Sequence, residues 1–481
     1  MSSIHYTPAT ELADRIQRGD LSPVTVVDAF LDRIEERDPE INAFVTVAEQ
    51  SAREAARDAA AAVERGDELG PLHGVPVAIK DLNHVAGMKT TFGSKPLADF
   101  VPEKDDHFVR RLKAAGAIVI GKTNTPEFGR KPMTTNEVVG ATGNPWDPSK
   151  TAAGSSGGSA AALAEGMVPL AQGSDAAGSI RAPSSACGVV GLMPDFGRVP
   201  QGPRADQFVN TMPFTFVGPM ARSVEDLELM LSVMAGHDAD DPFSLPDRAM
   251  GSGPAVDRGI GGATVAYSPD LGIDFPIDPA VSSVVEDALA GFESAGATVE
   301  RADPAFDRSW EEVHEAISTL LQVRYVGMYD TFQTDSGVDL LDEANDVTPE
   351  VVSRIEKGLE LDAMDLRRAE TSRTKTYRTI QSVFDSYDYL VTPTLGLPPF
   401  PKNTKPQEIA GTEIDPLHGW MLTWPFNLTG NPAASVPAGF TADGLPVGLQ
   451  IVGPRHGDAD VLAASRAFER QRPWADAYPP S

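Results

Sequence analysis

A serine- and glycine-rich segment, residues 151–191, holds the residue types that could do covalent chemistry on a small ligand. It contains seven serines and eight glycines between short apolar runs, and only three charged residues, Glu165, Asp175 and Arg181. Glycine permits positive φ angles and lets a ligand approach the backbone closely. The pattern predicts a site at which serine hydroxyls and backbone N–H groups face one small ligand.

A lysine at the end of an apolar run could serve these serines as a base. The run Val-Pro-Val-Ala-Ile, residues 75–79, is typical of a buried strand, and Lys80 follows it directly. Because lysine is rarely buried without a partner, Lys80 is either a base or a side chain that reaches solvent or pairs with Asp81. A serine becomes nucleophilic only when a base takes its proton, and burial lowers the pKa of a lysine. The serines downstream favour the base.

Histidine and cysteine offer other routes to the same chemistry. The chain has eight histidines and one cysteine. No histidine lies in a context that marks it as a base, and the sequence leaves His237 and His418 open for that role. Cys187 lies among small and apolar residues, which predicts a buried, inert thiol and not a nucleophile.

Residues 116–123 match the phosphate-loop pattern GxxxxGK[ST] letter for letter. That motif works only when a flexible loop of exposed N–H groups leads into a helix. Here the residues between the glycines are Ala-Ile-Val-Ile, which predict a buried strand, and Pro126 lies where the helix should run. The pattern therefore predicts a strand and no nucleotide site.

The composition limits the partners and the compartment. The net charge is −29, with 12 lysines against 28 arginines, which predicts a solvated acidic surface and disfavours nucleic acid and anionic membranes. A single cysteine excludes an intrachain disulfide and favours a reducing compartment. No apolar run approaches the ~20 residues that span a bilayer, and the N-terminus lacks the pattern of a signal peptide. We expect a cytoplasmic protein with no nucleic-acid or membrane partner.

Short apolar strands alternate with helical stretches, which predicts one large α/β domain. Its sheet should be mixed, mostly parallel and twisted, with roughly ten strands and helices on both faces. Ser22 and Pro23 are typical of the start of a helix, an alanine-rich helix should cover about 46–66, and longer helical stretches should cover 310–332 and 349–386. We divide the single domain, residues 1–481, into an N-terminal helical cap (1–66), a core (67–235), a variable region (236–390) and C-terminal strands with a closing helix (391–481).

Several motifs in chain order resemble the amidase signature hydrolases. The two serine motifs keep the family's spacing of 24 residues between Ser155 and Ser179. The matching segments are GKTNTPEFG (121–129), NPWDPSK (144–150), GSSGGSAAALA (154–164), GSDAAGSIRAPSSACG (173–188) and TGNPAASVPAGF with GLPVGLQIVG (within 429–453). The resemblance therefore covers most of the chain and implies the amidase signature fold.

The resemblance also implies a Ser–cis-Ser–Lys triad. Ser179 matches the nucleophile, Ser155 matches the bridging serine that follows a cis peptide bond, and Lys80 matches the base. The other implied residues are the oxyanion-hole N–H groups of Ala176, Ala177, Gly178 and Ser179, the supporting Asp175, Arg181 and Ser156, and Phe128 and Gly129 in the substrate pocket. The variable region 236–390 should shape that pocket, and no cofactor or metal is implied.

This chain departs from the family pattern in two places. The family usually has D-x-G-G-S before the nucleophile, where this chain has Ala177, and P-G-G-S-S before the bridging serine, where it has Ala152-Ala153-Gly154. Ala177 keeps its N–H group, so the oxyanion hole should survive if its φ is negative. A positive φ would strain an alanine.

The implied reaction is hydrolysis of a C–N bond next to a carbonyl in an amide, anilide or carbamate, through an acyl-enzyme on Ser179. The serine motif looks similar to broad-specificity amidases, including aryl acylamidases and urethane-cleaving enzymes. The alternative is the glutaminase (A) subunit of a tRNA-dependent amidotransferase. In those proteins glutamine typically follows Ser-Ile-Arg, where this chain has Ala182, and the acidic charge disfavours tRNA. We expect a small-molecule amide or carbamate substrate and a monomer or homodimer.

Overall fold

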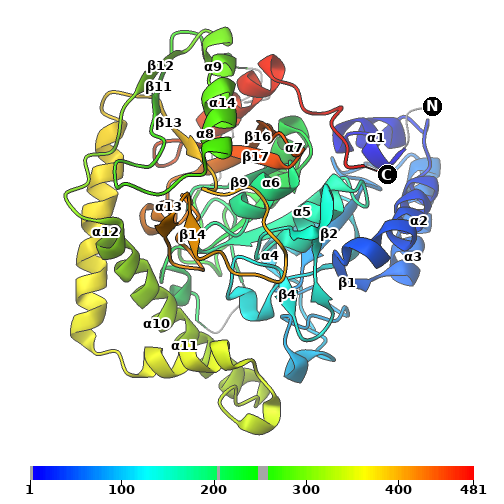
Figure 1. Ribbon diagram of the computed structural model, residues 1–481. Helices are drawn as coiled ribbons and strands as arrows, with labels where there is room; N and C mark the ends of the chain where they lie inside the picture. The colour runs from blue at the N-terminus through cyan, green and yellow to red at the C-terminus, as the bar shows by residue number, and fades with distance from the viewer. Residues whose placement is uncertain (1–3, 203–205, 247–257, 481) are drawn as a thin grey trace.

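In the part of the chain that the structure describes, eleven strands form one sheet in the order β1-β3-β2-β8-β10-β9-β16-β17-β13-β11-β12. This sheet runs through the middle of the molecule (Figure 1). The computed structural model describes residues 4–202, 206–246 and 258–480. The strands of the sheet are β1 (Phe44–Val47), β2 (Pro76–Lys80), β3 (Ile118–Thr123), β8 (Leu170–Asp175), β9 (Val190–Met193), β10 (Phe216–Ala221), β11 (Thr264–Tyr267), β12 (Thr298–Arg301), β13 (Tyr389–Pro393), β16 (Ala433–Phe440) and β17 (Pro446–Val452). Among the described residues, three two-stranded ribbons lie outside it: β4 (Thr135–Asn136) with β5 (Gly140–Ala141), β6 (Gly143–Asn144) with β7 (Asp147–Thr151), and β14 (Glu408–Ile409) with β15 (Thr412–Glu413).

The mixed α/β sheet is confirmed, but its strand pairs are not mostly parallel. Four neighbouring pairs are parallel and six are antiparallel. The reason is that β10 lies between β8 and β9 and runs antiparallel to both, and β17 does the same between β13 and β16. Alternation of strands and helices predicts crossovers such as β8–α6–β9, but it does not show that a later strand is inserted between their two strands.

Helices cover both faces of the sheet (Figure 1). Helices α5 and α6 pack against each other and against the central strands, whereas α7 packs against α14 and the strands beside it. The helices are α1 (Ala9–Gln17), α2 (Pro23–Ile41), α3 (Glu49–Arg65), α4 (His107–Ala114), α5 (Gly157–Ala164), α6 (Arg181–Cys187), α7 (Val224–Met234), α8 (Pro279–Ala288), α9 (Ala290–Ser294), α10 (Trp310–Ser336), α11 (Pro349–Leu359), α12 (Ala363–Val383), α13 (Pro425–Thr429) and α14 (Asp458–Gln471).

The predicted start of α2 is confirmed, because the Ser22 hydroxyl accepts a hydrogen bond from the Val24 N–H at 3.3 Å and Pro23 is the first helical residue. Helix α3 starts later than predicted. Residues 44–47 form β1 instead, which pairs with β3 at the edge of the sheet.

The chain folds as a single domain around this sheet. Strand β1 comes from the N-terminal residues and β16 and β17 come from the C-terminal ones, and all three belong to the same sheet. Helix α10 packs against both α11 and α12, and the three helices form an arm beside the sheet (Figure 1). The division into four regions stays a prediction.

The segment that matches the phosphate-loop pattern, residues 116–123, contains a strand, as predicted. Residues 118–123 form β3, all of them buried, with β1 on one side and β2 on the other. Lys122 Nζ donates to the Asn83 carbonyl oxygen and to Thr90 Oγ1, both at 2.7 Å, and lies 3.2 Å from Asp81 Oδ1. Neither its backbone nor its ammonium is available to a phosphate.

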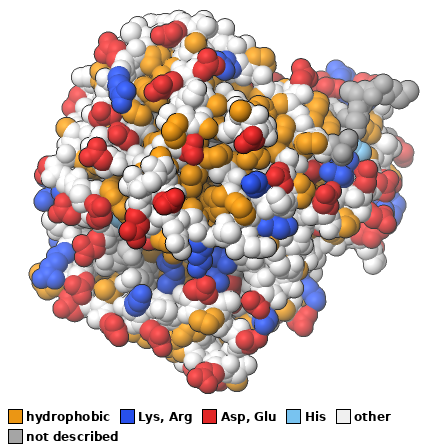
Figure 2. All heavy atoms as spheres, in the orientation of Figure 1, with side chains coloured by type: hydrophobic (Ala, Val, Ile, Leu, Met, Phe, Trp, Pro, Cys, Tyr) orange, Lys and Arg blue, Asp and Glu red, His pale blue; other side chains and the backbone are white. Residues whose placement is uncertain are grey.

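Acidic side chains are dispersed over the face shown in Figure 2, among basic and apolar ones. This arrangement accords with a net charge of −29 carried by a solvated surface. Within the described ranges, no helix is long and apolar enough to cross a membrane.

Candidate active site

The sheet brings Lys80 and the loop that carries Ser179 to the same edge. Strands β2 and β8 are parallel neighbours, with Val77 opposite Leu170. Lys80 ends β2 and Asp175 ends β8, and ligands of α/β sheets bind at the carboxyl ends of such strands. Ser155 reaches this edge from the loop that leads into α5.

Lys80 is fully buried, and three serine hydroxyls surround its amine. Lys80 Nζ lies 2.6 Å from Ser155 Oγ, 2.9 Å from Ser156 Oγ and 3.0 Å from Ser174 Oγ. Burial lowers the pKa of Lys80 well below its ordinary value, and the charge of Asp175 opposes this only in part. Burial thus favours the neutral amine, which is the form of lysine that can accept a proton.

Ser155 and Ser179 line the same pocket. The Gly154–Ser155 peptide bond is cis, as the resemblance implied. The Ser156 N–H donates to the Ser179 carbonyl oxygen at 3.1 Å, which holds the two serine segments together. The structure thus places Ser155 and Ser179 in the wall of one cavity, with the buried Lys80 amine within hydrogen-bond distance of Ser155.

The loop 176–179 presents backbone N–H groups beside Ser179. Among the described residues, the N–H groups of Ala176, Ala177 and Ser179 have no acceptor. Gly178 differs from the expectation, because its N–H donates to Asp175 Oδ1 at 2.6 Å and is not free for a substrate. The φ angle of Ala177 is not positive, so an alanine causes no backbone strain at this position. Three of the four expected donors therefore remain.

Gly178 is required by the packing of this loop. Its φ is +118°, and a Cβ atom at this position would lie 1.9 Å from Thr423 Oγ1. The Thr423 hydroxyl also donates to the Ala177 carbonyl oxygen at 2.8 Å. Thr423, from the C-terminal part of the chain, therefore packs against the turn that precedes Ser179.

A buried ion pair between Arg181 and Asp175 supports the loop 176–179. Arg181 is fully buried and donates to both oxygens of Asp175 at 3.0 Å. It also donates to the Thr423 carbonyl oxygen (2.8 Å), Gln450 Oε1 (2.6 Å) and Asn427 Oδ1 (2.7 Å). Burial would raise the pKa of Asp175, but the charge of Arg181 and the hydrogen bonds that Asp175 accepts from Arg181, Asn427 and the Ile180 N–H hold it below its usual value. Arg181 therefore fixes the loop and does not line the pocket.

The pocket is a cavity of about 270 Å³ with mainly apolar walls. Phe128 and Gly129 both line it. The Phe332 ring lies 5.2 Å from Phe92 and 5.3 Å from Phe128, measured between ring centroids. One face of α10 forms a wall, because the residues that it contributes recur at helical spacing; they include Leu321, Tyr325, Met328 and Phe332.

The histidines left open by the sequence do not line this pocket. His418 Nδ1 lies 3.0 Å from His314 Nε2, and His237 is exposed beside Ser244. His84 does line the pocket, and its ring packs against those of Phe92 and Phe100.

Cys187 is buried, and burial raises the pKa of its thiol. A thiol in this state is protonated and a weak nucleophile, which agrees with the expectation of an inert cysteine.

Sequence reasoning missed Ser174 and the residues that anchor the loop from the C-terminal part. The sequence does contain a signal that could have identified Ser174. This serine directly precedes Asp175, and it shares a strand face with Gln172, whose Oε1 accepts the Lys80 N–H at 3.1 Å. Thr423 and Asn427 have no such signal, since each lies more than 240 residues from its partner in the loop.

Comparisons with known proteins agree with this arrangement. Residues 25–462 match the Amidase family. The chain is 41% identical over 481 residues to an acylamidase of Rhodococcus erythropolis, covering 99% of this chain and 98% of that protein. It is 36% identical over 462 residues to the (A) subunit of a glutamyl-tRNA(Gln) amidotransferase of Alkaliphilus metalliredigens, covering 93% of this chain and 92% of that protein.

A solved structure is similar over almost the whole chain. It is a bacterial aryl acylamidase of the amidase signature enzymes, with a TM-score of 0.93, 33% identity and 98% of each chain covered. The family match, the full-length relatives and the shared fold lead to one conclusion: this chain is an amidase and belongs to the amidase signature family.

Proposed function

We propose that the chain hydrolyses amides of apolar or aromatic groups through an acyl-enzyme on Ser179. The observation that carries this proposal is the buried Lys80 amine, 2.6 Å from the hydroxyl of Ser155, beside a pocket that both Ser155 and Ser179 line. In this proposal Lys80 is the base and Ser155 passes the proton between it and Ser179.

The proposed reaction has two matching halves. Neutral Lys80 takes a proton from Ser155 as Ser155 takes one from Ser179, and the Ser179 oxygen attacks the substrate carbonyl. The relay then runs in reverse and protonates the leaving nitrogen, so the C–N bond breaks and an ester to Ser179 remains. Water repeats the attack on that ester while the relay takes its proton. The relay then returns the proton to the Ser179 oxygen as the acyl C–O bond breaks, which releases the acid and restores the free enzyme.

The negative oxygen of each tetrahedral intermediate needs donors that are already in place. We assign this role to the N–H groups of Ala176, Ala177 and Ser179, which have no other acceptor among the described residues. Removing one such donor typically costs ~2.7–4 kcal/mol of transition-state stabilisation. Asp175 and Arg181 act on the reaction through this loop and are positioning residues.

The pocket walls support an apolar acyl or aryl group as the substrate class. Phe92, Phe128 and Phe332 surround the cavity with aromatic surface, and α10 adds aliphatic side chains. The likeness to an acylamidase and to an aryl acylamidase supports the same class. Anilides and aryl-substituted amides are therefore the first substrates to test, and carbamates stay a further prediction.

The alternative is a glutaminase component of an amidotransferase, which the similarity to the amidotransferase protein of Alkaliphilus metalliredigens favours. The pocket favours an apolar substrate over glutamine, because aromatic rings of Phe92, Phe128 and Phe332 form much of its wall, although polar side chains such as Gln201 and Arg324 also line it. We further expect a cytoplasmic enzyme that acts as a monomer or homodimer.

The test is hydrolysis of p-nitroacetanilide and of L-glutamine by the purified full chain, without ATP or partner proteins. We expect release of p-nitroaniline and little ammonia from glutamine. Lys80→Ala and Ser179→Ala should remove nearly all turnover, and Ser155→Ala somewhat less, because water can partly replace a hydroxyl bridge. Their losses should not add, since the three residues act as one relay.

Two variants serve as matched controls. Ser184→Ala removes a buried hydroxyl of the same segment that donates to the Ile180 carbonyl oxygen at 2.8 Å and does not line the pocket. It should keep most of the activity. His84→Ala tests the imidazole that does line the pocket, and the lysine relay is wrong if this variant is inactive while Lys80→Ala turns over normally.

A further inference from the structure

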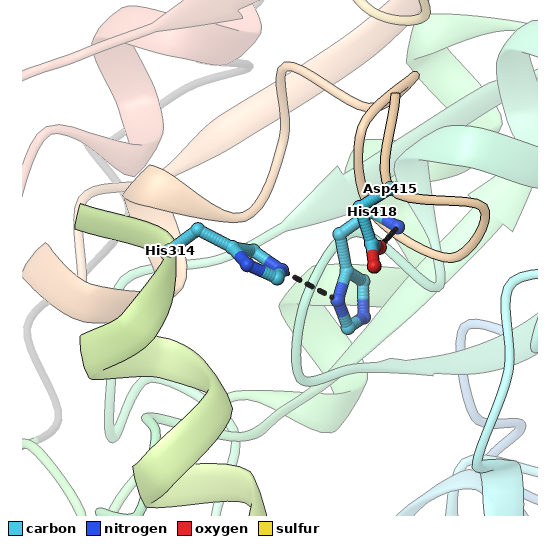
Figure 3. A group of neighbouring side chains, drawn as sticks. All are labelled: His314, Asp415 and His418. Atoms are coloured by element: carbon cyan, nitrogen blue, oxygen red, sulfur yellow. Dashed lines mark hydrogen bonds between the residues drawn. The ribbon is translucent and has the colours of Figure 1, made fainter. Parts of the chain in front are cut away.

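Two histidines and an aspartate from distant parts of the chain meet beside the helical arm (Figure 3). His314 lies on α10, whereas Asp415 and His418 lie in the turn that follows β15. His314 Nε2 is 3.0 Å from His418 Nδ1, and one donor atom of each of the three residues lies within 4.8 Å of the others. We propose that these three residues bind a divalent transition-metal ion of the zinc class.

The donor set has the chemistry that such an ion requires. Zinc binds imidazole nitrogen and carboxylate oxygen, and ligand atoms 2.0–2.1 Å from a tetrahedral ion lie about 3.3 Å from one another. The two imidazole nitrogens share a hydrogen bond at 3.0 Å. A bound ion would replace this hydrogen bond, with the ring proton moved to the other nitrogen, and the two ligand nitrogens would need to part by only a few tenths of an ångström. Asp415 supplies negative charge, and water can fill the fourth position.

Hydrogen bonds and ring contacts hold the three side chains in place. Asp415 Oδ1 accepts the N–H groups of Leu417 and His418 at 3.0 and 2.7 Å, which fixes the carboxylate over the turn. The turn is tight, since a Cβ atom on Gly419 would lie 2.6 Å from the Asp415 nitrogen. His418 is buried, whereas His314 and Asp415 are half-buried, so an ion can reach the group from solvent.

Aromatic rings flank His314 on α10. The Trp424 ring contacts it edge-on with centroids 5.5 Å apart, and the Trp310 ring lies 5.6 Å away. These contacts limit the rotation of the imidazole, as contacts around metal-binding histidines commonly do.

The proposed ion is separate from the reaction centre. None of its three ligands lines the pocket of Ser155 and Ser179. The turn that carries His418 continues into the segment of Met421 and Thr423, which packs against Gly178. A bound ion would therefore tie α10 to the segment that supports the oxyanion loop, and its role would be structural.

A second group of similar residues provides a control. His107, Asp238 and Asp240 also bring one donor atom each within 4.8 Å. There, however, Arg110 donates to Asp238 at 2.8 Å, so a cation already pairs with the carboxylate. We expect no transition-metal ion at that second group.

The experiment is a titration of the EDTA-treated full chain with Zn²⁺ by calorimetry, with thermal unfolding in parallel. We expect one ion per chain and a higher unfolding temperature in its presence, because a ligand of the folded state stabilises it. Co²⁺ should give the strong visible absorption of a tetrahedral site. His314→Ala, His418→Ala and Asp415→Asn should each weaken binding at least ~10-fold.

Asp415→Asn keeps the acceptor for the two N–H groups of the turn, so it loses the charge without losing the fold. His237→Ala, which removes an exposed imidazole, and His107→Ala, in the second group, should bind Zn²⁺ like the unmodified chain. The proposal is overturned if the unmodified chain binds no Zn²⁺, or if binding survives Asp415→Asn and His418→Ala. Loss of binding in His107→Ala instead would place the ion at the second group and equally overturn it. These readouts do not depend on amidase activity.

Discussion

Replacing Arg181 by methionine removes the cation that neutralises Asp175 under the oxyanion loop. Both side chains are fully buried, and the substitution deletes five hydrogen bonds, two of them to Asp175. Breaking a buried pair by removing one partner costs about 3–5 kcal/mol, because the other charge stays buried without compensation. We expect a loss of this size in the free energy of unfolding, measured by urea denaturation.

The same substitution should lower kcat, since the loop of Ala176 and Ala177 loses its support. A displaced oxyanion donor typically costs ~10²–10³-fold. Arg198→Met gives a matched control, because Arg198 pairs with the buried Asp458 at 2.9 Å and does not line the pocket. This control should lose stability to a similar extent and keep its kcat.

The pH dependence gives the sharpest part of this prediction. In the unmodified chain the pKa of Asp175 is lowered, so the stability that the pair contributes is present above the ordinary carboxyl pKa and is lost as the pH falls through the lowered value. In Arg181→Met burial is no longer opposed by Arg181 and should raise that pKa, so the folded state takes up a proton more readily than the unfolded one. The stability deficit of the variant should therefore shrink as the pH is lowered from 8 to 5. A deficit that is absent, or that does not change with pH, contradicts this reasoning.

Three further predictions concern the loop, the pocket and the base. Gly178→Ala should lower kcat at least ~10-fold, because its Cβ would lie 1.9 Å from Thr423 Oγ1. The control Gly66→Ala also has a positive φ but open space around it, so it should keep its kcat and lose only a little stability. A kcat of Gly178→Ala equal to that of the unmodified chain would refute the role of Gly178. Phe332→Ala should raise KM for anilides more than it changes kcat, checked by steady-state kinetics. Activity should rise with pH and then level off as Lys80 loses its proton, at a pH below the ordinary lysine pKa; a rate that falls through this range contradicts the assignment.

The parts of this fold that the sequence could predict are those that depend on neighbouring residues. The cap of α2 at Ser22 and the buried strand at 118–123 follow from local patterns, and both are present. The direction of the strands does not, because nothing in residues 216–221 indicates that β10 lies between β8 and β9. The order of the strands depends on contacts between segments that are far apart in the sequence, so local patterns do not reveal it.

The candidate site divides in the same way. The serine motifs and Lys80 could be identified because their residue types and spacing resemble a known family. The hydrogen bond from the Gly178 N–H to Asp175 could not be predicted, because it depends on the conformation of a four-residue loop. The pairing of His314 with His418 spans 104 residues, so no local pattern could reveal it.

The measurement that tests the central proposal most directly is the location of the acyl group on the enzyme. An aryl ester or a slow anilide is mixed with the full chain, the reaction is stopped with acid, and the modified peptide is identified by mass spectrometry. We predict one acyl group on Ser179, absent from Ser179→Ala and formed much more slowly by Lys80→Ala. An acyl group on Ser155, Ser174 or Cys187, or full turnover by Ser179→Ala, would contradict the account.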